Sequence, residues 1–447
     1  MIGSKKLSWN AAPLAELLRL SWPICVSMLS YSAMTLADTV FVGRLGKASL
    51  AGMGLAGTLA FAAVVFGIGL LRGVKVVVSQ AVGAGRQDRV GQYAASGILI
   101  AAVMGLSVLV LGQLLVLAVP LLAASTEASV VGVDYLFVRL LGAPLLFLFC
   151  TTRETSYGLG DTRSPMVASL LANVLNIVLD YVFIVELSSG ASGAAWATLF
   201  ATVLEVSVLL LLTRAPGFGQ LKKAGRYLRA VLQVGIPTGI QFAIEIGAFT
   251  LLTVLIASMS ETEMAAHQIA LSVIHFAFLP YVAISEAASV MVGQAVGANR
   301  DELVATVARY ALFTSLGYAL FCTALLIVEG DTIAGLFGVD SEVASVTTNL
   351  LYLAALFQIG DACNIVARGV LRGAGDVKWS ASVCVAIAWL VQPPLTWYFG
   401  YHLKMGAFGG WLAIVVEIFV GAGILWWRLS VGGWRPSARA ARRDLDI

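Results

Sequence analysis

The chain has 447 residues, of which 59% are hydrophobic and only 12% are charged. The charged fraction is roughly half that of an ordinary soluble domain, and several apolar runs exceed the roughly 18 to 20 residues that cross a bilayer. These values exclude a soluble globular protein and indicate a polytopic membrane protein. The formal net charge of +3 is small, and the basic residues sort by membrane side, so we expect no nucleic-acid partner.

In chain order, the apolar runs predict twelve membrane helices and an all-α fold. The first run is much longer than the apolar core of a signal peptide, so we expect it to remain as a membrane helix. The predicted spans are 14–43, 50–80, 92–120, 131–157, 164–186, 193–213, 229–258, 264–294, 303–329, 343–371, 377–400 and 408–428.

The most polar interior segment separates two sets of six spans. We predict an N-terminal six-helix lobe at 1–213, a cytoplasmic linker at 214–228, a C-terminal six-helix lobe at 229–428 and a basic cytoplasmic tail at 429–447.

The two lobes are copies of one another. The motif Gln-Ala-Val-Gly-Ala at 80–84 recurs at 294–298, a separation of 294 − 80 = 214 residues. A Gly-x-Gly-Asp turn at 158–161 recurs at 373–376, a separation of 215, and we expect each aspartate to cap the helix that follows. Since each copy has an even number of helices, the repeats are parallel, as in many transporters.

Lysine and arginine define the orientation, because they favour the cytoplasmic side. One side receives 22 of the 28 basic residues, so we expect both termini in the cytoplasm of a bacterium and a multi-pass protein in its inner membrane. The residues on this side are Lys5, Lys6, Arg19, Arg86, Arg89, Arg153, Arg163, Arg214, Lys222, Lys223, Arg226, Arg229, Arg300, Arg309, Arg368, Arg372, Lys378, Arg428, Arg435, Arg439, Arg442 and Arg443.

Two acids lie at matching depth in the first lobe. Asp38 is five residues before the end of the first span, and Asp180 lies in the outer part of the fifth. An ionisable group in hydrocarbon costs at least ~2.5 to 3.5 kcal/mol and usually marks function. If the two face each other, one can hold a proton while the other stays ionised. The polar residues on the same helix faces are Tyr31, Thr35, Asn173 and Asn176.

The second lobe carries a different pair, Glu245 and Asp361, which lie near the middle of their spans. Carboxylates with side-chain amides can hold a sodium ion, a proton or a cationic substrate, and the pattern leaves these three open. The neighbouring amides are Gln241, Gln358 and Asn364.

Arg72 and Glu286 occupy equivalent repeat positions, since 286 − 72 = 214. Repeat symmetry allows them to meet and form a gate that opens and closes, whereas the alternative is separate pairing within each half.

The architecture favours a transporter over a channel or scaffold. The sequence has no Walker loop, nucleophile elbow or metal-ligand spacing, so we expect no enzyme and no cofactor, and transport driven by an ion gradient. The Gly-x-Gly-Asp turn also occurs in intramembrane proteases, but here it falls at helix ends, twice.

Three motifs together resemble the multidrug and toxic compound extrusion (MATE) family across essentially the whole chain. They are the repeated Gln-Ala-Val-Gly-Ala, the run Ala-Ala-His-Gln-Ile-Ala-Leu at 265–271 and Gly-Val-Leu-Arg-Gly-Ala-Gly-Asp at 369–376. The resemblance implies a twelve-helix, two-lobe antiporter that expels organic cations and amphipathic drugs.

The resemblance also extends to the acids. Asp38 and Asp180 look like the aspartates of the DinF branch, which implies proton coupling, whereas Glu245 and Asp361 look like the cation site of the NorM branch, which implies sodium. The expected coupling ion is therefore H⁺ or Na⁺. We expect a monomeric multidrug antiporter in contact with membrane lipid; the alternative is a flippase for a lipid-linked precursor.

Overall fold

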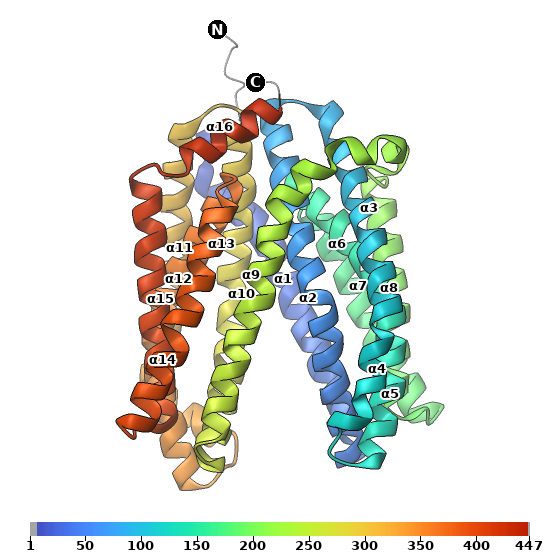
Figure 1. Cartoon of the computed structure of the whole chain (residues 1–447), viewed down its shortest axis with the longest axis vertical. Helices are drawn as coiled ribbons and strands as arrows, with labels where there is room; N and C mark the ends of the chain where they lie inside the picture. The colour runs from blue at the N-terminus through green and yellow to red at the C-terminus, as the bar shows by residue number, and fades with distance from the viewer. Residues whose placement is uncertain (1–6, 446–447) are drawn as a thin grey trace. The chain divides into compact units, whose positions relative to one another are not determined.

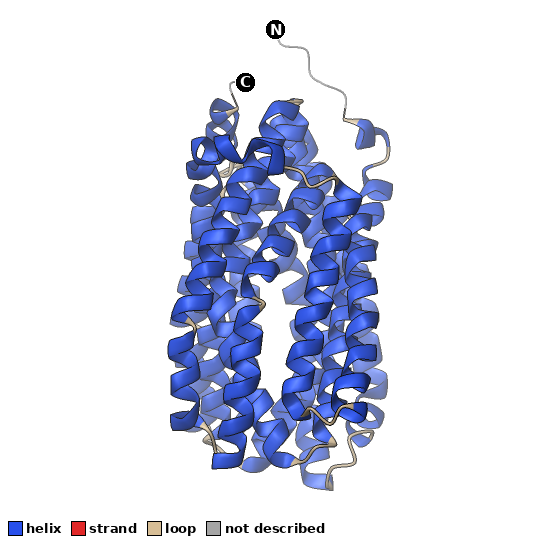
Figure 2. Ribbon diagram, turned by 90° about the vertical axis from the view of Figure 1, so that its right-hand side faces the viewer, coloured by secondary structure: helices blue, strands red, loops and turns tan. Residues whose placement is uncertain are grey.

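The structure is a computed structural model that describes residues 7–445, and these residues form helices and loops without a strand (Figures 1 and 2). In the described residues, eleven helices are long and apolar enough to cross a membrane, or twelve when one bent pair counts as a single span. The predicted all-α, twelve-span fold is confirmed. The undivided spans are α1 (Pro13–Gly43), α2 (Lys47–Ala84), α8 (Gly190–Thr213), α9 (Leu228–Ala257), α10 (Glu261–Gly297), α11 (Asp301–Gly335), α12 (Ser341–Gly373) and α15 (Gly406–Ser430).

Four predicted spans are interrupted. The third divides at Gly112, and the fourth bends by 44° at Gly142. Two other spans end in a π-helical turn, which widens the helix locally and often occurs at functional sites. The parts are α3 (Gln87–Leu111) with α4 (Gln113–Leu122), α5 (Thr126–Leu141) with α6 (Ala143–Leu159), α7 (Arg163–Asp180) with η2 (Tyr181–Glu186), and α13 (Val377–Leu390) with α14 (Gln392–Trp397) and η4 (Tyr398–His402).

Three short helices lie outside the predicted spans. They are η1 (Ser8–Ala11), η3 (Phe218–Tyr227) and α16 (Arg435–Asp444). The indole Nε1 of Trp9 donates to Gln294 Oε1 at 2.8 Å, and Arg442 Nε donates to the carbonyl of Val296 at 2.9 Å. The first and last described helices therefore meet at the same end of α10.

The chain divides into two compact units, and the division falls inside helices rather than in the linker. Within the described residues, the C unit comprises 7–25, Gly83–Gly85 and 241–445, and the N unit comprises 26–82 and 86–240. The helices α1 and α9 each contribute residues to both units. The predicted lobe boundaries place each of these helices in a single lobe. A repeat in the sequence does not reveal that one end of a helix packs in one unit and its other end in the other unit.

Glycines explain how the first part of α9 packs within the N unit. Gly69 and Gly73 on α2 face Gly235 and Gly239 on α9, so both helices carry a small residue at every fourth position. A Cβ at Gly73 would lie 2.8 Å from the backbone N of Gly235, and one at Gly69 would lie 2.8 Å from Gly239 Cα. Membrane helices approach this closely only where both surfaces lack side chains.

Gly73→Ala is therefore expected to lower the melting temperature of the purified protein, because forcing a methyl group against backbone costs about 1–3 kcal/mol. Thermal unfolding in detergent measures the effect. Gly57→Ala is the matched control on the same helix, since no atom lies within 4 Å of its Cβ position; that change is expected to be neutral or slightly stabilising. Equal effects from the two substitutions would contradict glycine packing.

Candidate functional site

Asp38 and Asp180 meet inside the N unit. Asp38 lies on the part of α1 that belongs to this unit and is 7% exposed, and Asp180 is the last residue of α7 and is fully buried. The two carboxyl groups lie within hydrogen-bonding reach of each other. No N–H or O–H group among the described residues donates to either oxygen of Asp180. Because two ionised carboxylates contain no donor, this contact requires a proton on one of them.

Amide side chains connect α7 to α1 beside this pair. With its amide oriented to satisfy both of its groups, Asn176 donates to Asp38 Oδ1 at 2.9 Å and accepts the backbone N–H of Thr198 at 3.2 Å. Asn173 donates to Ser30 Oγ at 2.7 Å. Both predicted asparagines therefore face α1, but only Asn176 contacts a carboxyl group directly.

An arginine that the sequence analysis did not assign to the site lies next to the acids. Arg139 on α5 hydrogen-bonds Tyr31 and interacts electrostatically with Asp38. Tyr135, one turn earlier, is 6% exposed and lies close to the same groups. Thr35 donates only to the carbonyl of Tyr31 in its own helix. One arginine, two aspartates and one proton give a neutral cluster.

The backbone is irregular where Asp180 lies. The α-helix ends at this residue and continues as the π-helical turn η2. A π-helical turn adds a residue and weakens the regular hydrogen-bond pattern. This aspartate therefore lies at an irregularity of a kind that is common at functional sites.

The C unit contains a second cluster of acids, and an arginine is part of it. Glu245 on α9 accepts from Gln241 Nε2 at 3.0 Å and from Arg368 Nη1 at 3.1 Å. Asp361 and Glu417 are 4% and 9% exposed and interact electrostatically with Arg368 and with each other. Glu417 on α15 and Arg368 were not assigned to the site from the sequence.

The other predicted amides connect helices. Gln358 Oε1 accepts from the hydroxyl of Tyr281 at 2.9 Å, while Asn364 Nδ2 donates to the carbonyl of Ile418 at 3.4 Å. Gln358 Nε2 and Asn364 Oδ1 are buried and have no partner among the described residues. These amides lie one turn on either side of Asp361, so unused polar atoms are present near its carboxylate.

The two clusters differ in charge balance. In the C unit, three carboxylates and one guanidinium leave a net charge of −2 when all are ionised, and one carboxylate already has Arg368 as its partner. The cluster in the N unit needs one proton for neutrality, whereas the cluster in the C unit needs two positive charges. An unbalanced buried charge is costly, so the cluster in the N unit favours binding of one proton and the cluster in the C unit favours binding of cations.

The structure gives Glu286 a partner other than Arg72. Arg372 Nη1 lies 3.1 Å from Glu286 Oε1, and both side chains are less than a tenth exposed. In the N unit, Arg72 interacts electrostatically with Glu154, whose carboxylate also pairs with Lys75 at 3.7 Å. The arrangement is the alternative to the predicted gate, with separate pairing in each half. Repeat symmetry is an unreliable guide here because the partners Glu154 and Arg372 each occur in one copy only. Their equivalent positions in the other copy are Gly369 and Tyr157, which carry no charge.

Two copies of a six-helix unit, with acid clusters inside membrane-length helices, define a membrane transporter. The chain belongs to the MatE family, whose family model matches residues 23–182 and 237–398. Members of this family are transporters and not enzymes.

Curated relatives match over nearly their full length. The chain is 31% identical to a "Probable multidrug resistance protein NorM" of Rhodopseudomonas palustris, covering 95% of this chain and 93% of that one. A protein of the same name in Bacillus licheniformis is 28% identical, with 91% and 93% covered.

Solved structures share the fold. A structure described as an outward-facing conformation of a multidrug resistance MATE family transporter has a TM-score of 0.88 at 22% identity and covers 95% of this chain and 97% of that one. A MOP superfamily transporter from Pyrococcus furiosus has a TM-score of 0.86 at 22% identity, with the same coverage.

The pairing of Glu286 with Arg372 predicts a specific pattern of stabilities. Arg372→Met alone is expected to destabilise the protein by about 3–5 kcal/mol, because it leaves a buried carboxylate without its counter-charge. Adding Glu286→Gln is expected to restore much of that loss. Thermal unfolding of the two single variants and the double variant measures the coupling. Additive losses would show that the two residues do not act as a pair.

Proposed function

We propose that the protein is a proton-coupled multidrug antiporter and that Asp38 and Asp180 carry the coupling proton. The observation that supports this proposal is the close approach of two buried carboxyl groups, which can share a hydrogen bond once one of them is protonated. Such a pair binds one proton in common. Loss of that proton leaves two adjacent negative charges, so the protonated and deprotonated states favour different packing of α1 and α7.

The surroundings of the pair favour a proton over a sodium ion. Sodium is a hard cation that needs several oxygen ligands. Around Asp38, however, Asn176 presents its N–H group and Arg139 contributes positive charge. Both groups oppose a second cation at this carboxylate, whereas a proton only completes the hydrogen bond between the acids.

We assign the acid cluster of the C unit to cationic cargo or to a second coupling ion. Its excess negative charge suits the protonated amine or quaternary ammonium of a lipophilic drug. Sodium at Glu245 and Asp361 is the alternative within this site. In that case Arg368 would have to leave Glu245, because a guanidinium 3.1 Å from the carboxylate repels an added cation.

The proposed substrates are cationic or amphipathic drugs. This proposal is supported by the multidrug resistance names of the relatives and by the net negative charge of the cluster in the C unit. A flippase for an anionic lipid-linked precursor would need uncompensated cations in its cavity. The buried cations Arg72 and Lys75 both interact with Glu154, whereas the C unit carries three carboxylates around one guanidinium, which favours the drug antiporter.

We further propose that a single chain operates as a monomer in the bacterial inner membrane with both termini in the cytoplasm. The asymmetry of lysine and arginine between the two membrane sides supports this orientation. The meeting of η1 and α16 at one end of α10 is consistent with it.

Proteoliposomes that hold a fluorescent cationic drug test the coupling ion. A pH gradient alone, with no sodium gradient, is expected to drive drug transport by the wild-type protein. Asp38→Asn is expected to reduce this transport to the level of empty liposomes, because an amide at this position removes one of the two carboxyl groups that share the proton. Asp134→Asn, at an exposed aspartate of α5, is the matched control and is expected to transport normally.

Transport by Asp38→Asn at the wild-type rate would remove the pair from the coupling mechanism. Transport by the wild type under a sodium gradient, but not under a pH gradient, would transfer the coupling to the acids of the C unit.

Arg368→Gln tests whether the arginine excludes sodium from the C unit. Without the guanidinium, the three carboxylates gain affinity for a small cation, since no internal positive charge offsets them. The melting temperature of the variant is expected to rise on replacing choline chloride with sodium chloride, and more than that of the wild type. Arg309→Gln, on α11, is the control for a general effect of removing a charge. An identical sodium response in both variants and the wild type would contradict this role of Arg368.

A further inference from the structure

The last described helix, α16, has one face that packs on the C unit. Ala438 is fully buried, and Trp434 and Leu445 are at most 5% exposed. Ser437 Oγ donates to Asp376 Oδ1 at 2.9 Å, and Arg442 pairs with Asp301. These contacts fix the rotation of a short helix that sequence alone would leave undefined.

The opposite side of α16 carries a stripe of arginines. Arg435, Arg439 and Arg443 are exposed and occur at every fourth position, so they fall within an arc of about 80° on the helix. None of the three forms an ion pair with any residue between 7 and 445. With four arginines and one aspartate, α16 has a formal charge of 4 − 1 = +3.

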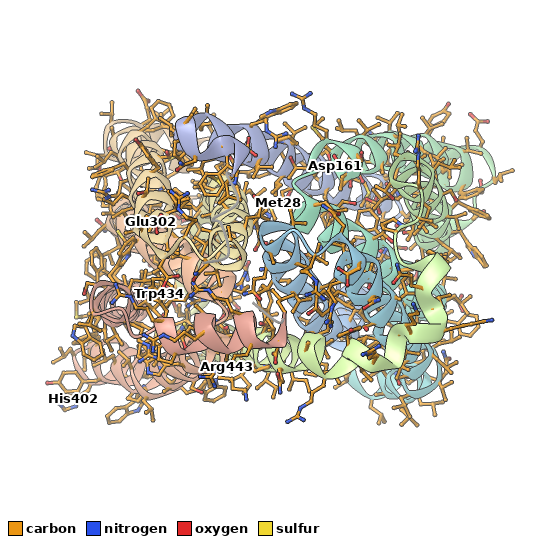
Figure 3. All side chains as sticks on the ribbon, turned by 90° about the horizontal axis from the view of Figure 1, so that it is seen from above. Met28, Asp161, Glu302, His402, Trp434 and Arg443 are labelled. Carbon is orange, nitrogen blue, oxygen red and sulfur yellow. The ribbon has the colours of Figure 1, made fainter. Side chains whose placement is uncertain are left out.

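The position of α16 places this stripe close to the membrane surface. The helix begins five residues after the end of α15 and runs across the ends of the longer helices of its unit (Figure 1). In the last turn of α15 and just beyond it, Trp427 and Val431 are 60% and 57% exposed. Exposed tryptophan is typical of the boundary between hydrocarbon and headgroups. Trp434 and Arg443 lie near the two ends of α16, as Figure 3 shows.

We propose that Arg435, Arg439 and Arg443 form a binding site for anionic phospholipid headgroups of the cytoplasmic leaflet. Guanidinium groups bind phosphate oxygens through paired hydrogen bonds. A basic segment next to a membrane helix is attracted to anionic lipid. The proposal rests on the orientation given under the proposed function, because anionic lipid must be present on the side where α16 lies.

The two faces of α16 have different contacts. The packed face of α16 contacts the ends of α10 and α11 through Arg442, which bonds both Val296 and Asp301. A lipid headgroup on the exposed stripe therefore holds α16 between the membrane surface and the turn that joins these two helices.

The test measures lipid binding directly and does not depend on transport. The full-length protein in detergent is titrated with dioctanoyl phosphatidylglycerol, and bound lipid is counted by native mass spectrometry. The R435Q/R439Q/R443Q variant is expected to bind at least about tenfold more weakly, since each arginine near an anionic surface contributes about fivefold, or ~1 kcal/mol. Dioctanoyl phosphatidylcholine is expected to bind the variant and the wild type equally.

Two controls make the result specific. The K222Q/K223Q/R229Q variant removes the same charge from exposed residues of the N unit and is expected to bind phosphatidylglycerol like the wild type. Inorganic phosphate at the same concentration is expected not to displace the lipid, which separates a headgroup site from a site for free anions.

Three results would overturn the proposal: wild-type lipid affinity in the arginine variant, an equal loss in the control variant, or displacement by phosphate. If the triple variant unfolds, Arg439→Glu alone serves instead, and unchanged affinity there also rejects the site. Because the measurement involves no drug and no gradient, failure of the lipid site leaves the antiport proposal intact. Absence of gradient-driven drug transport by the wild type would contradict the antiport proposal and would leave the lipid site untouched.

Discussion

The main constraint on this structure is that charge buried in the membrane must be balanced inside each unit. Glu286 is paired with Arg372, and Glu154 is paired with both Lys75 and Arg153, so these groups are suited to holding helices together. Among the described residues, Asp38 and Asp180 have each other, an amide and one nearby arginine. We propose that a mobile ion, rather than a fixed side chain, completes their balance. The difference between a paired and an unpaired acid therefore separates structural charges from candidates for coupling.

The repeat preserved the scaffold while the chemistry of the copies diverged. At the two Gly-x-Gly-Asp turns, Asp161 accepts the backbone N–H of Ser164 at 3.0 Å, as predicted for a cap. The prediction was wrong for Asp376, which forms no such cap and instead accepts from Arg428 Nε at 2.9 Å and from Ser437. In the second copy, Asp376 accepts a hydrogen bond from Ser437 on α16 and so holds this helix against the C unit. An equivalent position in a repeat thus predicts backbone geometry better than it predicts side-chain partners.

Hydrophobic length predicted the spans because each must cross the same thickness of hydrocarbon. Matching depth also predicted that Asp38 and Asp180 could meet. It could not identify Arg139, Arg368 or Glu417, because depth is readable from sequence but the rotation of each helix depends on packing. An arginine inside a membrane span is itself a sign of a functional site. Arg139 could therefore have been named as a candidate on that ground, although matching depth alone did not reveal its contact with the acids. For Glu417 the only signal was an acid inside the last span.

The helix α1, which carries the proposed proton site, contributes residues to both units. The residues of α1 up to Cys25 belong to the C unit and those from Val26 belong to the N unit, and Pro23 lies just before this division. Proline removes one backbone hydrogen bond and allows a helix to bend. Asp38 lies on the same continuous helix, four turns beyond that point. In the proposed function, a change of charge at Asp38 therefore acts on a helix whose other end is packed in the C unit.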